Sequence, residues 1–149
     1  MSLRDPRILE TYFEIQSLIY QWAHCLDQGK YSEIPDLFTD EGIYIFDENW
    51  DIRGRAQLEA RYRDRAATDR VARHVSTNLI ISVLNSDRAS GTGTLTVYRH
   101  VGAGLGSTVP ASVQDFKDIY EKSSDGRWRF AERRLTQVFA LTTGPGNAR

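Results

Sequence analysis

Hydrophobic residues in the first part of the chain recur at the three- and four-residue steps of an amphipathic helix. The pattern is carried by Ile8, Leu9, Tyr12, Phe13, Ile15, Leu18, Ile19, Trp22, Ala23 and Leu26. Asp5 can cap the free backbone N–H groups at the start of this helix, and Pro6 suits its first turn. Gly29 provides a stop at the other end. We therefore predict a long helix from Pro6 to about Gln28.

Two shorter helices and a small hairpin are predicted next. Ser32 can cap a short helix in which Pro35 is confined to the first turn. Further on, Leu58, Tyr62 and Ala66 lie one turn apart among many charged residues, which indicates a helix with a narrow buried stripe. The predicted elements are a helix at 32–38, a turn at 39–42, a hairpin formed by 43–46 and 52–54, and a mostly solvent-exposed helix at 55–67.

The second half of the chain consists of β-branched and aromatic runs separated by turn residues. These runs predict four long antiparallel strands at 72–84, 89–101, 111–121 and 127–141. The loop at 102–110 is glycine-rich and is interpreted as a flexible connection or a mobile lid. Helices followed by a long-stranded meander are typical of an α+β fold, with the curved antiparallel sheet closing like a cone around the first helix. A pocket remains wherever that helix does not fill the cone.

Composition indicates one globular domain covering residues 1–149, with 144–149 as a loose tail. Hydrophobic residues make up 40% of the chain and charged residues 26%, and the net charge of -1 disfavours nucleic acid and anionic membranes as partners. The single cysteine, Cys25, excludes an internal disulfide. We find neither a signal peptide nor an apolar run of about 20 residues, so we expect a cytoplasmic protein.

Asp27 and His74 are the main candidates for chemistry, and each has two interpretations. A carboxylate at a helix C-terminus is unfavourable, so Asp27 either orients a histidine or begins the turn. His74 opens the longest strand, with Ser76 and Asn78 on its face, and this polar face lines either a pocket mouth or ordinary solvent. The sequence separation leaves their pairing open. Tyr20 shares a helix face with Asp27, which suits a cavity wall.

Other polar residues are weaker candidates. His24 and His100 could reach the same cavity, and Asp115 could line it. The three histidines form no His-x-x-x-His or Glu-x-x-His pattern, so no metal site is predicted. Alternation along the last strand assigns Arg127, Arg129 and Arg133 to a solvated or subunit-facing surface, opposite Trp128 and Phe130. Arg134 shares the Trp128 face if no bulge intervenes, and could then pair with Glu132 or contact an anionic substrate group.

Four blocks, at 20–27, 37–42, 73–78 and 125–130, carry a resemblance that covers nearly the whole chain. They read YQWAHCLD, LFTDEG, RHVSTN and DGRWRF. In this order and spacing they resemble the SnoaL-like branch of the nuclear transport factor 2 superfamily. That group includes scytalone dehydratase, hexachlorocyclohexane dehydrochlorinase, bile-acid dehydratase and, more distantly, ketosteroid isomerase.

The resemblance implies a cone-shaped α+β barrel that forms a dimer or trimer and uses no metal or organic cofactor. In dehydratase-like members an aspartate at the position of Asp27 holds a histidine at the position of His74. Trp22 stands where the dehydrochlorinase pattern has a lysine, and Leu26 where scytalone dehydratase has a tyrosine. The isomerase base falls near Phe46. Halide elimination and steroid isomerisation are therefore not supported.

The sequence thus predicts a cofactor-independent lyase, most like a dehydratase, or an isomerase, acting on a small hydrophobic or aromatic metabolite. The acid/base pair would be Asp27 and His74 in an apolar cavity. The predicted substrate-binding residues are Tyr20, Trp22, Tyr44, Phe46, Asn78, Tyr98 and Phe116. The alternative is a non-catalytic binding or assembly protein like the small subunit of ring-hydroxylating dioxygenases, in which His74 would face solvent or Trp22 and Phe46 would fill the cavity.

Overall fold

The computed structural model describes residues 5–141, so the predicted tail at 144–149 lies outside the described residues. The first helix, α1, spans Pro6–Asp27, as the hydrophobic spacing predicts. The Asp5 side chain caps it by accepting a hydrogen bond of 3.0 Å from the backbone N–H of Arg7. At the other end, Gly29 takes the left-handed conformation (φ 72°) that favours glycine after a helix.

The short elements that follow also agree with the predicted types. They are the 3₁₀ helix η1 (Tyr31–Leu37), the strands β1 (Phe38–Phe46) and β2 (Trp50–Arg53), and the helix α2 (Arg55–Ala66). One boundary differs, because the predicted turn at 39–42 is an irregular part of β1. The register of β1 against its neighbour shifts between Phe38 and Ile43. Gly42 permits this irregularity, since a Cβ there would lie 2.8 Å from the Cβ of Phe38.

Six strands form one curved sheet in the order β2-β1-β6-β5-β4-β3. The four long strands are β3 (Arg70–Val83), β4 (Arg88–Val101), β5 (Ser112–Lys122) and β6 (Trp128–Ala140). The sheet is mixed rather than purely antiparallel, because β1 pairs in parallel with β6, starting at Phe38 and Phe130. It is also open, with β2 and β3 as its two edges, so the predicted cone is not a closed barrel.

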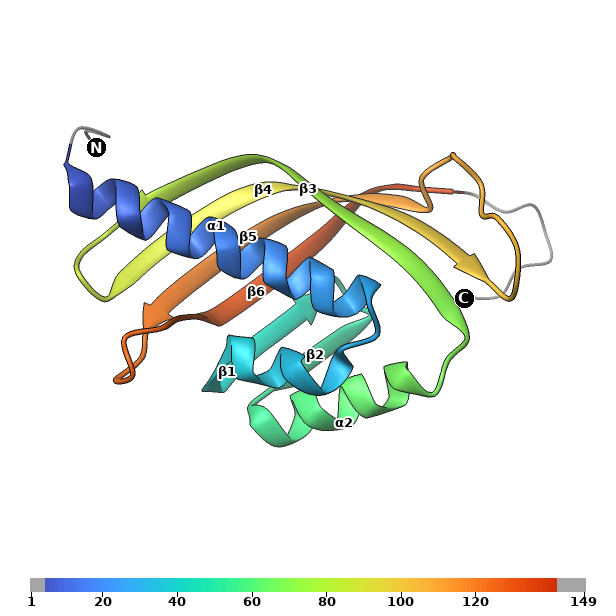
Figure 1. The fold of residues 1–149 in the computed structure, drawn as a ribbon, viewed down its shortest axis with the longest axis horizontal. Coiled ribbons are helices and arrows are strands. Elements are labelled where there is room, and N and C mark those ends of the chain that lie inside the picture. The colour runs from blue at the N-terminus through green and yellow to red at the C-terminus, as the bar shows by residue number, and fades with distance from the viewer. Residues whose placement is uncertain (1–4, 142–149) are drawn as a thin grey trace.

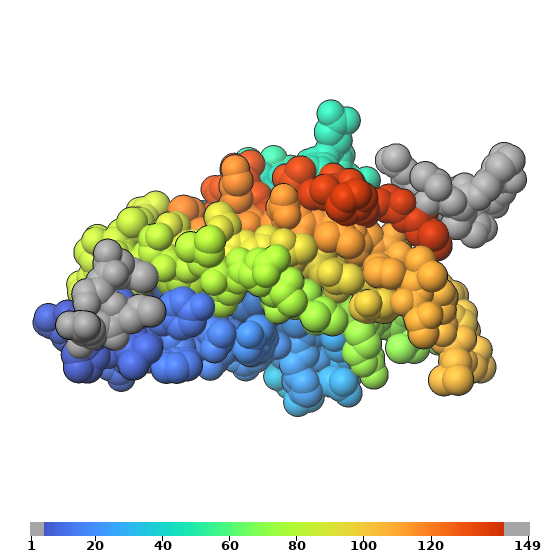
Figure 2. All heavy atoms as spheres, turned by 90° about the horizontal axis from the view of Figure 1, so that it is seen from above, coloured from blue at the N-terminus to red at the C-terminus, as the bar shows by residue number. Residues whose placement is uncertain are grey.

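The sheet bends around α1, which lies along its concave face (Figure 1). The helix α2 lies beyond β1 and β2, and its far end leads into β3 (Figure 1). Seen from above, α1 in blue forms one layer and the long strands form the other (Figure 2). The fold is therefore α+β, with the C-terminal end of α1 close to the first residues of β3.

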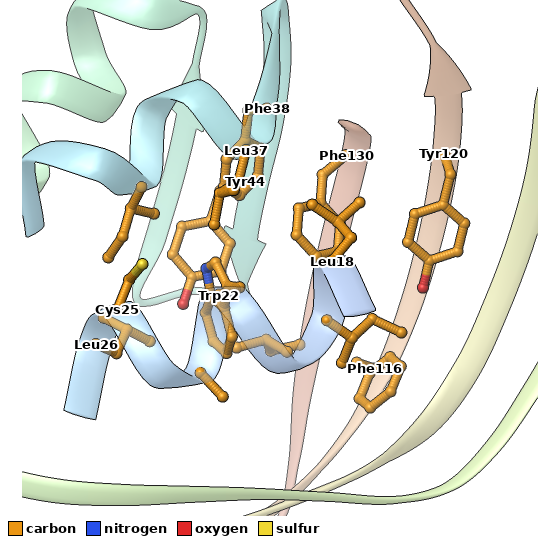
Figure 3. Packing of buried hydrophobic residues seen from close by; sticks show 14 of the residues in the cluster. Leu18, Trp22, Cys25, Leu26, Leu37, Phe38, Tyr44, Phe116, Tyr120 and Phe130 are labelled. Carbon is orange, nitrogen blue, oxygen red and sulfur yellow. The ribbon is translucent and has the colours of Figure 1, made fainter. Parts of the chain in front are cut away.

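The hydrophobic core fills the space between α1 and the concave face of the sheet. Trp22 and Leu18 of α1 lie among aromatic side chains from the strands, including Tyr44, Phe116 and Phe130 (Figure 3). Trp22 is 1% exposed and Phe130 is fully buried. No helix within residues 5–141 is long and apolar enough to cross a membrane.

Candidate active site

Asp27 and His74 are in direct contact at the edge of the sheet. Asp27 is the last residue of α1, and His74 lies near the start of the edge strand β3. The Asp27 Oδ1 atom lies 2.6 Å from His74 Nδ1, and Asp27 Oδ2 accepts the backbone N–H of His74 at 2.9 Å. Their side chains are 14% (His74) and 10% (Asp27) exposed. Two N–H donors thus compensate for the unfavourable position of this carboxylate at a helix C-terminus.

The contact fixes the role of each imidazole nitrogen. An ionised carboxylate can only accept hydrogen bonds, so Nδ1 of His74 must donate to Asp27. The neutral imidazole then carries its proton on Nδ1 and an unshared electron pair on Nε2. The edge of Trp22 meets the imidazole, with ring centroids 5.7 Å apart, and supports its orientation. His74 is therefore held in one tautomer, with Nε2 available to accept a proton.

His74 lines a cavity of about 130 Å³ between the helices and the concave sheet face. One part of the wall is aromatic and consists of Trp22, Tyr44, Phe46, Trp50 and Tyr62. The remainder includes polar side chains, among them Ser112, Gln114 and Gln137, and four arginines. The sequence predicts an apolar cavity, but the wall contains both aromatic and cationic side chains.

The tyrosines of the wall are hydrogen-bond donors rather than bases. Burial raises the pKa of the Tyr44 hydroxyl to about 12 and that of Tyr62 well above its ordinary value. Their rings are stacked, with centroids 6.5 Å apart, and Trp22 Nε1 donates to the Tyr62 hydroxyl at 3.4 Å. Both hydroxyls stay protonated at neutral pH.

Two residues predicted to position a substrate lie outside the cavity lining. Tyr20 is 49% exposed because it lies on the flank of the buried stripe of α1, where no strand covers it as β3 covers Asp27. Asn78 is exposed because β3 bulges between Thr77 and Ile80, and Asn78 adopts a positive φ of 54° there. The bulge shifts the alternation by one residue and removes Asn78 from the face of His74.

Two predicted wall residues also lie elsewhere. Leu95, Val97 and Arg99 line the cavity, so Tyr98 between them is directed to the opposite face of β4. Phe116 does face inward, but it is 1% exposed and packs in the core against Arg133 rather than lining the cavity. Trp22, Tyr44 and Phe46 do line the cavity.

The weaker candidates are outside the cavity lining too. His24 and Asp115 are exposed, His100 Nε2 lies 3.2 Å from the carbonyl oxygen of Ala103, and the exposed Arg134 pairs with Glu132. The assignment of Arg133 to a solvated surface is wrong, because Arg133 is completely buried.

A bulge in β6 accounts for the burial of Arg133. Tyr120 pairs with Phe130 whereas Ile119 pairs with Glu132, so Ala131 is an extra residue in β6. The extra residue turns Arg133 inward and Arg134 outward.

Sequence reasoning missed the four arginines of the cavity, Arg61, Arg65, Arg70 and Arg99. Arg61 and Arg65 lie one turn apart on α2, Arg70 is the first residue of β3, and Arg99 is near the end of β4. The one signal in the sequence is the spacing of Arg61 and Arg65 on either side of the buried Tyr62, which puts the pair on the edge of the buried stripe. Arg70 and Arg99 join them only through the pairing of β3 with β4.

Comparison with known protein families finds a match over residues 7–134 to the SnoaL-like domain. The chain belongs to the SnoaL-like family. A comparison with curated proteins finds no significant match. The fold is shared by a protein of unknown function from Mycobacterium tuberculosis, at 27% identity and a TM-score of 0.78, covering 95% of this chain and 79% of that one.

Two solved structures from Novosphingobium aromaticivorans also share the fold of this SnoaL-like chain. One, provisionally assigned as a scytalone dehydratase, is 17% identical with a TM-score of 0.81 and covers 96% of this chain and 98% of its own. The other, described as an NTF2-like protein with a cystatin-like fold, is 21% identical with a TM-score of 0.72, covering 97% and 95%. Within residues 5–141 of the SnoaL-like chain, no three His, Cys, Asp or Glu side chains cluster as metal ligands would.

Proposed function

We propose that this SnoaL-like protein is a cofactor-independent acid/base enzyme, a dehydratase-like lyase or an isomerase. The observation that carries the proposal is the 2.6 Å contact between His74 Nδ1 and Asp27 Oδ1 beside a cavity that His74 lines. A histidine held in one tautomer by a buried carboxylate is the usual arrangement of a general base. The SnoaL-like family includes dehydratases and isomerases, which agrees with this chemistry.

In the proposed reaction, His74 Nε2 takes a proton from a carbon next to a carbonyl group. The imidazolium that forms is stabilised by the carboxylate of Asp27. Tyr44 can donate a hydrogen bond to the carbonyl oxygen as negative charge develops there, since its hydroxyl stays protonated. The imidazolium then returns the proton, either to a departing hydroxyl group, which releases water, or to another carbon, which gives an isomer.

The cavity favours a small substrate with a flat, apolar part. Trp22, Tyr44 and Trp50 offer aromatic surfaces on one side, and the volume of about 130 Å³ is suited to a compact molecule. The non-catalytic alternative requires either that the His74 side chain is exposed to solvent or that Trp22 and Phe46 fill the cavity. His74 has 14% of its side chain exposed, and both aromatic residues form wall around an open volume.

We also propose that the protein assembles into a homo-oligomer, a dimer or a trimer. Large apolar side chains are exposed on the long strands, including Ile80 and Phe139, each at 67%. The resemblance to the SnoaL-like branch implies such an assembly, and exposed apolar side chains would supply its contact surface where they form a contiguous patch. Light scattering coupled to gel filtration should give a mass of two or three chains, and a single-chain mass would contradict the proposal.

The test of the catalytic proposal is proton exchange and turnover on a panel of small cyclic ketones and β-hydroxy ketones. In deuterated buffer, the wild-type protein should speed deuterium uptake next to the carbonyl group, as measured by NMR. The His74→Ala variant should be slower by roughly 10²- to 10⁴-fold, because positioned proton transfer contributes about that much. His24→Ala is the matched control, since His24 is exposed on α1, and should retain the wild-type rate. Undiminished exchange in His74→Ala would contradict the proposal.

A further inference from the structure

Four arginines line the same cavity. Arg61 and Arg65 approach from α2, while Arg70 and Arg99 approach from β3 and β4. The pairing of Ala72 with Arg99 brings the beginning of β3 next to the end of β4, so Arg70 and Arg99 are close diagonal neighbours on the sheet. Three elements, of which α2 and β3 are consecutive in the chain, thus bring positive charge to one cavity.

No carboxylate within residues 5–141 forms an ion pair with any of these four guanidinium groups, whereas Arg55 at the start of α2 does form ion pairs, with Asp36 and Asp40. The carboxylate of Asp27 acts on Arg65, but both its oxygens accept hydrogen bonds from His74. Residues 1–4 and 142–149 contain neither aspartate nor glutamate. The cluster therefore has four positive charges and no acidic side chain committed to them.

The electrostatic consequence is visible in the two arginines that are most affected. Burial, together with the neighbouring arginines, lowers the pKa of both Arg65 and Arg70. Arg65 has a structural use, because it donates to the Thr68 hydroxyl and to the carbonyl oxygen of Arg70. The Arg61 guanidinium carbon lies over the ring of Trp50, 4.6 Å from its centroid, a contact that uses none of the N–H donors of the guanidinium.

One residue of the cavity wall also has an unsatisfied donor. The indole Nε1 of Trp50 is buried and has no hydrogen-bond partner within the described part of the chain. Buried donors are usually paired, and an unpaired N–H group beside several positive charges is complementary to an oxyanion.

We propose that the substrate of this site carries an oxyanion, a carboxylate or a phosphate, which Arg61, Arg70 and Arg99 bind. The inference rests on the proposed function, because the anion site and the acid/base pair share one cavity. The guanidinium groups would hold the anion, and the apolar part of the molecule would lie against the aromatic side chains within reach of His74. The arginines would thus select the substrate and set its orientation relative to the base.

The three tryptophans allow the inference to be tested by NMR. Trp22 and Trp50 line the cavity, whereas Trp128 lies outside it with its Nε1 donating to Glu14 at 3.0 Å. Indole N–H signals of ¹⁵N-labelled protein are followed during titration with benzoate, phenyl phosphate and neutral benzamide. We expect at least one anion to shift the Trp22 and Trp50 signals, with a Kd about tenfold or more below that of benzamide, and to leave Trp128 unchanged.

Charge-removing variants assign the effect to the cluster. Arg61→Gln, Arg70→Gln and Arg99→Gln should each raise the Kd of the anion about tenfold, and the exposed Arg99 can be replaced with little risk to folding. The matched control is Arg63→Gln, because Arg63 is exposed on the same helix and does not line the cavity. Preference for phenyl phosphate over benzoate, or the reverse, identifies which oxyanion the site takes.

Three results would overturn the inference. These are equal affinity for the anions and benzamide, no cavity shift with either anion at millimolar concentration, or an equal loss in Arg63→Gln. The His74→Ala variant should bind the anion as the wild type does. Loss of turnover in that variant without any anion preference would leave the proposed function standing and refute only the anion site. Anion preference with undiminished turnover in His74→Ala would refute the proposed function and leave the anion site standing.

Discussion

Two aspartates, the partly buried Asp27 and the buried Asp118, face basic side chains, but the two pairs are built differently. Asp27 meets His74 at the edge of the sheet, with its Oδ1 2.6 Å from Nδ1 and its Oδ2 accepting a backbone N–H. Asp118 lies opposite Arg133 in the middle of the sheet, where β5 pairs with β6. Its Oδ1 is 3.8 Å from Arg133 Nε, and both side chains are completely buried.

The central pair relies on aromatic rings more than on hydrogen bonds. The Arg133 guanidinium lies 4.1 Å from the ring centroid of Trp22, and 4.8 Å from those of Phe116 and Phe130. None of its three nitrogens has a hydrogen-bond partner within residues 5–141. Tyr120 donates its hydroxyl to Asp118 Oδ2 at 2.8 Å. Cation–π contacts therefore offset part of the cost of burying this charge, in the absence of well-formed hydrogen bonds.

The difference separates a pair that borders the cavity from a pair that belongs to the core. The carboxylate of Asp27 has a full set of donors, and its histidine borders the cavity. Arg133 is closed off by three aromatic rings and does not line the cavity. Burial alone consequently does not mark a candidate site, whereas close hydrogen-bond geometry beside an open volume makes Asp27 and His74 the candidate pair.

The largest effect is expected for Asp27→Asn, which tests the first pair. Asparagine offers one acceptor oxygen, while His74 presents two N–H donors to this side chain. One contact must fail, and an amide NH₂ facing Nδ1 would stabilise the tautomer that is protonated on Nε2. Turnover should fall by about 10⁴-fold, as in other cases where the orienting carboxylate is replaced by an amide. Steady-state kinetics with the exposed Asp115→Asn as control provides the measurement, and a loss below tenfold would contradict it.

The next effect is expected for Arg133→Met, which tests the second pair. The substitution leaves Asp118 buried without its cation and removes the contacts with three rings. The free energy of unfolding should decrease by about 3–5 kcal/mol at pH 7, as measured by urea denaturation. Adding Asp118→Asn should restore part of the loss, because no buried charge then remains. The control is Arg134→Met on the exposed side of β6, for which a change within about 1 kcal/mol is expected. A similar loss in both arginine variants would refute this view.

The pH dependence of stability should distinguish Asp118 from an ordinary aspartate. Burial raises the pKa of Asp118 from 3.8 to about 6, although the charge of Arg133 opposes the rise. A carboxyl with a raised pKa binds its proton more tightly in the folded protein. The contribution of Asp118 to the free energy of unfolding is thus present below about pH 4 and is lost as the pH rises through about 6. Relative to Asp118→Asn, the wild type should lose on the order of 3 kcal/mol of stability between pH 4 and pH 7. A constant difference between the two proteins would contradict the assignment.

Regular periodicity explains why most of the fold could be predicted from the sequence. The stripe of α1 and the long strands β3 to β6 repeat their hydrophobic pattern often enough to be recognised. Two single-residue bulges could not be predicted, because a bulge in the middle of a strand changes no composition and leaves the element itself intact. They account for the incorrect placement of Asn78 and of Arg133.

Sites assembled across long sequence separations were less predictable. Asp27 and His74 are 47 residues apart, and local spacing left each with two interpretations until the resemblance to a family suggested the pair. The parallel pairing of β1 with β6 and the meeting of four arginines depend on how whole elements pack. Residue type and position on a helix or strand do not determine such contacts.

The smallest predicted effect concerns Trp22, whose indole contacts both His74 of the first pair and Arg133 of the second. One edge of its indole meets the imidazole of His74, and the guanidinium of Arg133 lies over its face. Trp22→Phe keeps an aromatic ring but removes the Nε1–H donated to Tyr62 and reduces the surface under Arg133. We expect a loss of about 1–2 kcal/mol of stability and a decrease in turnover of less than tenfold.

In a double-mutant cycle with Arg133→Met, the stability effects should be coupled by at least about 0.5 kcal/mol, because the two side chains are in contact. The effects on turnover should instead be independent of Arg133. Strong coupling in turnover would mean that the buried cation acts on His74 through the indole, and the two pairs would then have to be treated as one unit.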